Sequence, residues 1–390
     1  MNTPPRPALP AQVVALGWVS LLMDASSELI HSLLPLYMVT VLGASALAVG
    51  IIEGIAEATA AMVKIFSGAI SDWMGRRKPL LLAGYGLGAI SKPLFPLAET
   101  LTAIFAARFL DRIGKGIRGA PRDALVADVT PPAQRGAAYG LRQSMDTVGA
   151  VLGPLLAVAL MSLTHDDFRA TFWVAVIPAM LCVLVIVFAV HDAPTTLPRP
   201  ARIPISRAEL ARLPRAFWWL TGFAALLTLA RFSEAFLLLR GENLGIALAW
   251  TPALLALMNV VYAASAWPLG RLFDSGHRRG LLIAGVVLLV AADLVLAWGN
   301  GPWAVALGAV LWGLHMGATQ GILSALVADV APDDLRGTAF GCFSLASGIA
   351  LLIASVMAGV LWTWVDPSAT FFAGAMCAAL ALPGLLRRIR

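Results

Sequence analysis

Charged side chains inside apolar runs are the residues of this sequence whose types and spacing could do chemistry. The first long run, 13–41, carries Asp24 and Glu28 four residues apart and His31 three residues further on. On a helix this spacing places all three on one face. Two neighbouring carboxylates repel each other and favour holding a proton, which a nearby histidine can exchange. The pattern predicts a proton relay, and internal salt bridges to another helix explain it equally well.

A stripe of cations marks the run 101–127, where successive members are four, three, three and four residues apart: Arg108, Arg112, Lys115, Arg118 and Arg122. This spacing puts all five on one side of a helix, with Asp111 beside them to neutralise part of the charge. We expect Arg112 and Lys115 to line a cavity, where the inner cations attract an anionic or chelating ligand. For Arg118 and Arg122 we expect salt bridges near the cytoplasm.

Other ionisable residues lie in further apolar runs, where each costs at least ~2.5 kcal/mol to insert at the bilayer centre and therefore faces a cavity or a partner. Glu53 and Glu57 lie near the cation-poor end of their run, so we expect them in water at an outer mouth. Arg231, Glu234 and His315 are the candidates for ligand contacts in the later part of the chain.

The elements that must position these residues are membrane-spanning helices. Of the 390 residues, 59% are hydrophobic and 13% are charged, whereas soluble domains carry about 25% charged residues. Apolar runs of roughly 20 residues, long enough to cross a bilayer, recur along the chain. We predict an all-α integral membrane protein with twelve transmembrane helices, near 13–41, 46–71, 79–98, 101–127, 137–163, 168–190, 216–239, 249–273, 280–298, 302–328, 338–363 and 367–386.

The basic residues are distributed as in cytoplasmic loops of a membrane protein. The net charge of +6 could indicate nucleic-acid binding, but the cations form short clusters between apolar runs, such as Arg76-Arg77-Lys78. The loops on the other side are nearly free of cations, so both termini are expected in the cytoplasm. The first run is too long for a signal peptide. We therefore expect a bacterial-type inner membrane location and no nucleic-acid partner.

An internal repeat divides the chain. Residues 124–129 (Ala-Leu-Val-Ala-Asp-Val) recur at 325–330, and Arg135-Gly136 recurs as Arg336-Gly337, always 201 residues later. Same-direction repeats of six helices predict two bundles related by a pseudo-twofold axis along the membrane normal. The expected domains are a six-helix bundle at 1–191, a Pro- and Arg-rich cytoplasmic linker at 192–215 and a second six-helix bundle at 216–390.

The loop after the second run resembles a motif of the major facilitator superfamily, and the resemblance covers essentially the whole chain. Residues 68–78 are Gly-Ala-Ile-Ser-Asp-Trp-Met-Gly-Arg-Arg-Lys, which fits the family pattern G-x-x-x-D-x-x-G-R-R/K. The glycines allow a tight turn, and the aspartate can cap a neighbouring helix. The resemblance implies a gate latch formed by Gly68, Asp72, Gly75 and Arg76; a plain cytoplasmic loop would explain the cations but not the Gly/Asp spacing.

Two further segments are similar to family signatures. Arg108-Phe-Leu-Asp111-Arg112-Ile-Gly114 is similar to R-x-x-Q-G-x-G, whose arginine is implicated in proton coupling, with Asp and Arg in place of Gln and Gly. Residues 149–157, Gly-Ala-Val-Leu-Gly-Pro-Leu-Leu-Ala, resemble the G-x-x-x-G-P-x-x-G signature of drug/proton antiporter branches. Small residues let helices approach closely and proline kinks a helix, which implies a gating role for Gly149, Gly153 and Pro154. A packing face of small residues is the alternative.

The resemblance implies a secondary transporter that exports a small organic molecule in exchange for protons by alternating access, and the cations of 101–127 favour an anionic or chelating one. The alternative is an importer or exchanger of organic anions that uses the cations of 101–127 as its substrate site. The sequence holds no Walker sequence, HExxH, GxSxG or Cys/His cluster, so we expect neither an enzyme nor a cofactor or metal site. The expected partners are the substrate, protons and the bilayer, with the chain acting as a monomer.

Overall fold

A computed structural model describes residues 9–192, 207–274, 277–332 and 335–388, and every regular element in these ranges is helical. The first half, meaning the described residues up to 192, holds α1 (Ala11–His31), α2 (Leu34–Thr40), α3 (Ala46–Met74), α4 (Lys78–Ser91), α5 (Leu94–Leu97), α6 (Leu101–Asp128), η1 (Pro132–Gln134), α7 (Arg135–Thr164) and α8 (Phe168–Ala189). The second half, from residue 207 on, holds α9 (Arg207–Arg212), α10 (Arg215–Ala230), α11 (Ala235–Asn243), η2 (Leu248–Trp250), α12 (Ala253–Asp274), α13 (Arg278–Trp298), α14 (Pro302–Val330), α15 (Arg336–Trp364) and α16 (Pro367–Arg388).

The long helices are membrane spans by length and composition. In the described ranges, ten helices are long and apolar enough to cross a bilayer, and α16 contains a shorter apolar stretch. Helix α6 has 28 residues, as long as its neighbours, but it carries too many charges to meet the same criterion. The prediction of an all-helical, multi-pass membrane protein is confirmed.

Some predicted spans are interrupted; 79–98, for example, forms α4 and α5. The run 13–41 forms α1 and α2, because Pro35 near the start of α2 has no N–H and its ring excludes a helical carbonyl one turn earlier. The run 216–239 forms α10 and α11, separated by residues 231–234. In this break no proline intervenes; instead the N–H of Ser233 donates to Oγ of Ser355 on α15, 3.2 Å away.

The repeat seen in the sequence also holds for contacts between helices. Arg77 Nε lies 3.2 Å from Asp128 Oδ2, which joins the start of α4 to the end of α6. Arg278 and Asp329 stand 201 residues later. They join α13 to α14 with a separation of 3.0 Å between Arg278 Nη1 and Asp329 Oδ2. The two halves therefore share tertiary contacts as well as sequence.

A second contact fixes the register of the same helix pairs. A β-carbon placed on Gly114 of α6 would lie 2.6 Å from the carbonyl oxygen of Gly84 on α4. At the positions 201 residues later, Nδ1 of His315 on α14 lies 2.8 Å from the carbonyl oxygen of Gly285 on α13. Helices α4 and α6 therefore pack in the same register as α13 and α14.

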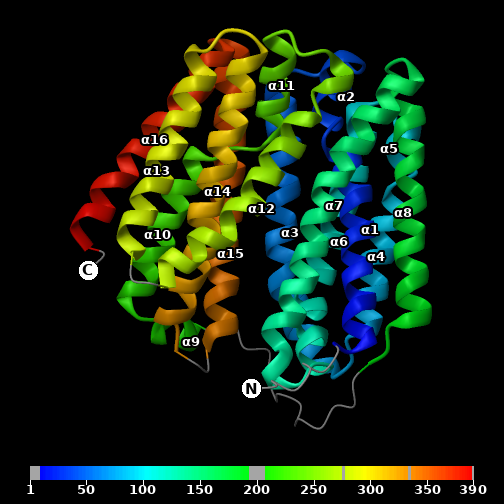
Figure 1. Cartoon of the computed structure of the whole chain (residues 1–390), viewed down its shortest axis with the longest axis vertical. Helices are drawn as coiled ribbons and strands as arrows, with labels where there is room; N and C mark the ends of the chain where they lie inside the picture. The colour runs from blue at the N-terminus through cyan, green and yellow to red at the C-terminus, as the bar shows by residue number, and fades with distance from the viewer. Residues whose placement is uncertain (1–8, 193–206, 275–276, 333–334, 389–390) are drawn as a thin grey trace, which may run out of the picture.

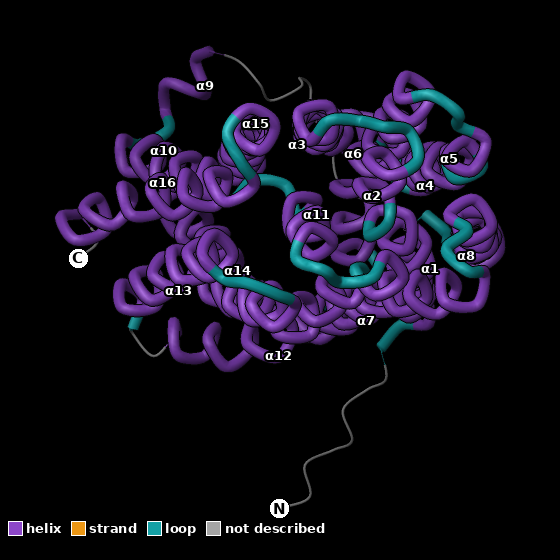
Figure 2. Tube along the Cα trace, turned by 90° about the horizontal axis from the view of Figure 1, so that it is seen from above, coloured by secondary structure: helices purple, strands orange, loops and turns teal. Residues whose placement is uncertain are grey.

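The halves meet along two helix pairs. Figure 1 shows the helices of the first half on the right and most of those of the second half on the left, and Figure 2 shows the same arrangement from above. Helix α3 packs along α15 and α7 along α12. Glycines permit the close approach: a β-carbon on Gly54 would lie 2.8 Å from Leu352 Cδ1, and one on Gly359 would lie 2.7 Å from Leu47 Cα.

Candidate functional site

A cavity of about 520 Å³ lies between the two halves. Helices α1, α3, α6 and α7 line it from the first half, and α10, α14 and α15 line it from the second. Most of its ionisable side chains come from the first half: Asp24, Glu28, Glu57, Lys64, Lys115, Arg118, Arg122 and Asp146. Within the described residues the second half adds Arg231 and His315. The cavity is therefore polar on one wall and nearly uncharged on the other.

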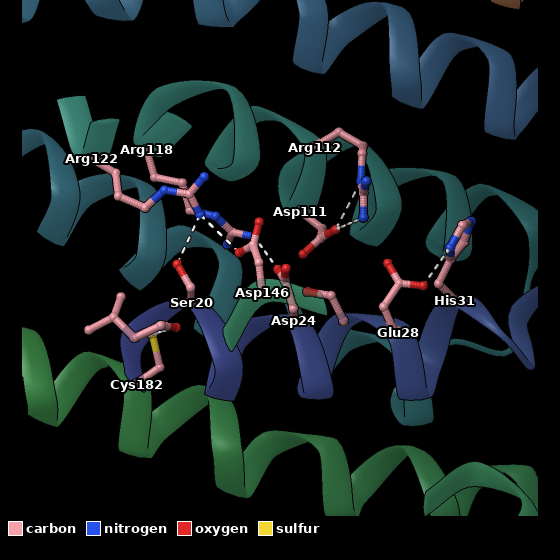
Figure 3. A network of polar contacts seen from close by, with 12 residues as sticks. Ser20, Asp24, Glu28, His31, Asp111, Arg112, Arg118, Arg122, Asp146 and Cys182 are labelled. Atoms are coloured by element: carbon pink, nitrogen blue, oxygen red, sulfur yellow. Dashed lines mark hydrogen bonds and ion pairs between the residues drawn. The ribbon is translucent and has the colours of Figure 1, made fainter. Parts of the chain in front are cut away.

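Asp24 of α1 and Asp146 of α7, named here the carboxyl pair, lie next to each other at the cavity (Figure 3). Two carboxylates held this close repel each other, so a proton on one member stabilises the pair. Arginines surround the pair: Arg118 lies 3.9 Å from Asp24, while Arg122 and Arg142 lie 3.3 and 3.2 Å from Asp146. Arg118 and Arg122 do form the expected salt bridges, and these line the cavity.

His31 and Arg108 contact Glu53 of α3, and His31 also contacts Glu28. His31 Nδ1 lies 3.3 Å from Glu28, its Nε2 lies 3.3 Å from Glu53, and Arg108 Nη2 lies 2.6 Å from Glu53. Since both ring nitrogens face carboxylates, both donate and the ring is positively charged. Glu53 is fully buried, so the expectation that it sits in water at an outer mouth was wrong. Its burial is possible because two cations neutralise it.

Arg112 and Asp111 bind each other behind the cavity wall. Arg112 Nη2 lies 2.8 Å from Asp111, and its Nη1 lies 2.9 Å from Glu57. Asp111 also accepts from Lys92 Nζ at 2.7 Å, and Lys92 in turn donates to Ser27 Oγ at 2.9 Å. Arg112 and Asp111 are buried and are not among the cavity-lining residues. Sequence reasoning missed Lys92, although a single lysine within an apolar run indicates a buried charge that needs a partner.

Three cations face the cavity without an ion pair, as far as the described residues extend: Lys64, Lys115 and Arg231, named here the free cations. The side chains of Lys64 and Lys115 are exposed in the cavity, and Arg231 is half-buried. Glu234 does not line the cavity. His315 lines it with Nδ1 bound to a backbone carbonyl and Nε2 unpartnered. Because a carbonyl only accepts, Nδ1 carries the proton, and Nε2 of the neutral ring is an acceptor.

The loop between α3 and α4 is tied to the end of α8. Gly75 has φ +62°, a conformation that favours glycine. Asp192 Oδ1 accepts from the backbone N–H groups of Arg77 and Lys78, both at 2.7 Å, and Asp192 Oδ2 lies 3.5 Å from Arg76 Nε. The carboxylate that caps α4 is therefore Asp192, which follows α8.

Two other members of the predicted latch lie on α3. A β-carbon on Gly68 would lie 3.2 Å from Cβ of Ala120, so Gly68 lets α3 approach α6. The backbone of Asp72 is helical, but its side chain lies outside the described part of the chain. A close approach of helices is thus visible at Gly68.

The small residues of α7 bring this helix against the carboxylate face of α1. A β-carbon on Gly149 would lie 3.0 Å from Cβ of Asp24, and one on Gly153 would lie 2.7 Å from Cβ of Glu28. Pro154 follows inside the same helix. The segment that resembles the antiporter signature therefore packs against two of the predicted proton-relay residues.

An all-helical fold whose repeated halves enclose a charged cavity defines a multi-pass membrane transporter. The chain belongs to the Major Facilitator Superfamily, whose family model matches residues 16–275. A model described as "Sugar (and other) transporter" matches residues 213–385. The predicted family is confirmed.

Similar proteins span nearly the whole chain. An MFS-type transporter of Methanocaldococcus jannaschii is 30% identical over 97% of this chain and 94% of its own length. The inner membrane transport protein YajR of Escherichia coli is 26% identical over 94% of this chain and 81% of its own. The human organic anion transporter MFSD10 superposes with a TM-score of 0.72 at 20% identity, covering 98% of this chain and all of that one.

Proposed function

We propose that this chain is a proton-coupled secondary transporter of a small organic anion. The observation that carries the proposal is the set of free cations in the cavity, Lys64, Lys115 and Arg231. Cations without a carboxylate partner attract an anionic ligand and form strong, charge-assisted hydrogen bonds with it. Arg231 belongs to the second half and both lysines to the first. An anion that bridges them contacts both halves, as alternating access around a central site requires.

The proposed topology has twelve spans in two six-helix bundles, at 1–191 and 216–390, joined by a cytoplasmic linker at 192–215. Both termini and the basic loops lie in the cytoplasm of a bacterial-type inner membrane, and the chain acts as a monomer. The shared contacts of α4 with α6 and of α13 with α14 support the two bundles. In this orientation the cavity lies toward the cytoplasm, because its α6 lining, Lys115 to Arg122, precedes the cytoplasmic loop after Asp128.

We propose export in exchange for protons as the transport mode. The carboxyl pair is the proton site, and Glu28, His31 and Arg108 form the adjoining relay. The latch around Gly75 and the α7 glycines serve as gates. Support for antiport comes from the α7 segment, since Gly149 and Gly153 hold α7 against the face of α1 that carries Asp24 and Glu28. A change in protonation can thus alter the packing of two helices that line the cavity.

A second candidate is uptake of an organic anion together with a proton. The placement of the free cations favours it, because an anion bound near them adds negative charge beside the carboxyl pair and stabilises the proton there. Anion and proton would then move in the same direction. The human structural neighbour is described as an organic anion transporter, but a likeness of fold carries no substrate, so the cations remain the argument.

The test is proton movement in proteoliposomes that hold the full chain and a pH-sensitive dye. The probes are succinate, benzoate and the cation tetraphenylphosphonium. We expect proton flux opposite to succinate or benzoate and none with tetraphenylphosphonium. Asp24→Asn removes the shared proton and should uncouple the proton flux from the anion flux. Arg231→Ala should abolish anion movement. Arg169→Ala is the control, since Arg169 is half exposed, is not among the cavity-lining residues and pairs with Glu99 at 3.8 Å.

The outcomes separate the candidates. Proton and anion fluxes in the same direction would replace antiport by co-transport. Anion flux without proton flux in the wild-type chain would contradict proton coupling. Movement of tetraphenylphosphonium alone would contradict the anion site, because the free cations repel it.

A further inference from the structure

Asp293 is a buried acid that the proposed transport site does not use. It lies on α13 with no exposed surface and does not line the cavity. Neither carboxylate oxygen has a hydrogen-bond partner in the part of the chain that the structure describes. A lone carboxylate in an apolar interior is costly, so such a group is either neutral or holds a cation.

The internal repeat identifies what stands opposite Asp293. With the offset of 201 residues, Lys92 corresponds to Asp293 and Asp111 corresponds to Trp312. In the first half Lys92 and Asp111 form an ion pair of 2.7 Å between α4 and α6. Helices α13 and α14 share that register, which the contacts at Arg278 and His315 fix. The indole Nε1 of Trp312 is buried and, like Asp293, lacks a partner among the described residues.

The end of α10 supplies a third group. This helix stops at Ala230, so the carbonyls of its last turn have no helical N–H four residues ahead. A β-carbon on Gly374 of α16 would lie 2.6 Å from Oδ2 of Asp293 and 3.1 Å from the carbonyl oxygen of Ala230. The glycine therefore leaves no side chain between the carboxyl group and this carbonyl.

The three groups match the hydrogen-bonding needs of a neutral carboxylic acid. Such an acid has one O–H donor and one carbonyl acceptor, an indole N–H only donates, and a backbone carbonyl only accepts. We propose that Asp293 is a proton-binding site of the second half, which when protonated can donate its O–H to Ala230 and accept from Trp312. A metal cation fits less well, because an indole N–H is only a donor and cannot serve as a metal ligand.

The elements beside α13 carry charged and titratable groups, but within the described residues none of them forms an ion pair with Asp293. These groups are Arg231 after α10, Arg240 on α11, Arg271 on α12, His315 on α14 and Cys377 on α16. Arg240 donates to the carbonyls of Leu296 and Ala297, and Arg271 stacks on Trp267. Cys377 interacts electrostatically with Asp293 but brings no positive charge. No ion pair reaches Asp293 in the described residues, so a proton is the simplest means of neutralising it.

The site adjoins the break between α10 and α11. Phe232, within the break, packs edge-on against Trp312 with 5.7 Å between ring centroids. Arg231 precedes it and lines the cavity. Loss of the proton would create a carboxylate beside the end of α10 and attract Arg231 away from the cavity. This consequence rests on the proposed function, because it couples the proton at Asp293 to release of the anion.

Infrared difference spectroscopy on the full chain in lipid vesicles tests proton binding without a substrate. We expect wild-type protein at neutral pH to show the carbonyl stretch of a protonated carboxyl group that Asp293→Asn lacks. Trp312→Phe keeps the ring and removes the N–H, so it should shift this band to higher frequency and leave it present. Trp312→Phe alone also reports on the site if Asp293→Asn does not fold. Anion flux through Asp293→Asn should no longer respond to a pH gradient across the membrane. Anion exchange at equal pH on both sides should persist.

Other results would overturn the inference. Identical spectra for wild type, Asp293→Asn and Trp312→Phe would show that Asp293 holds no proton. Loss of the band on adding sodium chloride, with no loss on adding choline chloride, would assign the carboxylate to sodium. Absence of the band together with normal gradient-driven flux would refute this site and leave the proposed function intact. Presence of the band without flux of any probe would support the proton site and refute the proposed substrate class.

Discussion

The two halves pack their helices in the same way but have different types of residue at the equivalent contacts. In the first half Arg108 and Glu53 form a buried ion pair of 2.6 Å between α6 and α3. The positions 201 residues later are Ala309 and Leu254, both buried apolar residues. Buried ion pairs and well-packed apolar residues can stabilise a fold about equally. The fold therefore tolerates apolar residues at these positions, and the charges of the first half serve another purpose.

A neighbouring pair of positions shows the same contrast between the halves. Arg112 and Glu57 lie 2.9 Å apart. The corresponding residues are Gly313 and Met258, where a β-carbon on Gly313 would lie 2.5 Å from the carbonyl oxygen of Met258. At this pair of positions the second half joins its helices through close backbone contact, whereas the first half joins them through long charged side chains. Charged side chains can exchange partners when a proton or an anion arrives, and close backbone contacts cannot. We infer that the first half responds to ligands through exchange within a network of ion pairs, whereas the second half responds at two isolated residues, Arg231 and Asp293.

The largest expected effect comes from breaking one charged pair. Replacing Arg108 with Ala leaves Glu53 buried with His31 as its remaining cation, which should cost about 3–5 kcal/mol of unfolding free energy. The double variant Arg108→Ala, Glu53→Leu reproduces the second half at both positions and should regain most of this loss. Thermal unfolding in detergent measures both. Equal destabilisation in the single and double variants would show that the two halves are not interchangeable at this contact.

A smaller effect, on the KM of transport, is expected from replacing one of the free cations. Lys115 corresponds to Met316, so Lys115→Met gives the first half the apolar residue of the second. Hydrogen bonds to charged groups contribute about 1.5–3 kcal/mol, which predicts a roughly 10- to 100-fold rise in KM. Initial rates in proteoliposomes, with whichever of succinate or benzoate moves faster, measure this. An unchanged KM would remove Lys115 from the anion site.

The smallest effect compares two equivalent ion pairs. The Arg278–Asp329 pair is about half exposed on both sides, whereas the Arg77 side chain is 17% exposed and also donates to Ser71 Oγ at 2.7 Å. Exposed pairs contribute about 0–1 kcal/mol. Arg77→Ala should therefore cost about 1 kcal/mol more unfolding free energy than Arg278→Ala. In detergent it should accordingly lower the Tm further than Arg278→Ala does. The reverse order would show that the latch of the first half is not the more stable one.

Sequence patterns predicted the fold well because it depends on apolar runs and on the repeat, which are local or periodic. The break between α10 and α11 escaped prediction, since no proline marks it and Ser233 finds its partner on α15. The residue types of the site were also predictable, because charge in a membrane helix is conspicuous. Their pairing was not, because spacing along one helix does not reveal the depth and rotation of the next. Glu53, Arg112 and Asp293 all illustrate this limit.

The charges of α6 also have a consequence for biosynthesis. This helix is not apolar enough to qualify as a span by itself, yet it must enter the bilayer. Its partners Glu53 and Glu57 on α3 and Lys92 at the end of α4 precede it in the chain. They are therefore already in the membrane when α6 leaves the ribosome. Each buried arginine of α6 thus has a carboxylate partner made earlier in the chain, whereas the less buried Arg122 pairs with Asp123 of its own helix and with Asp146 on α7, which follows. Insertion of α6 thus depends on the helices made before it.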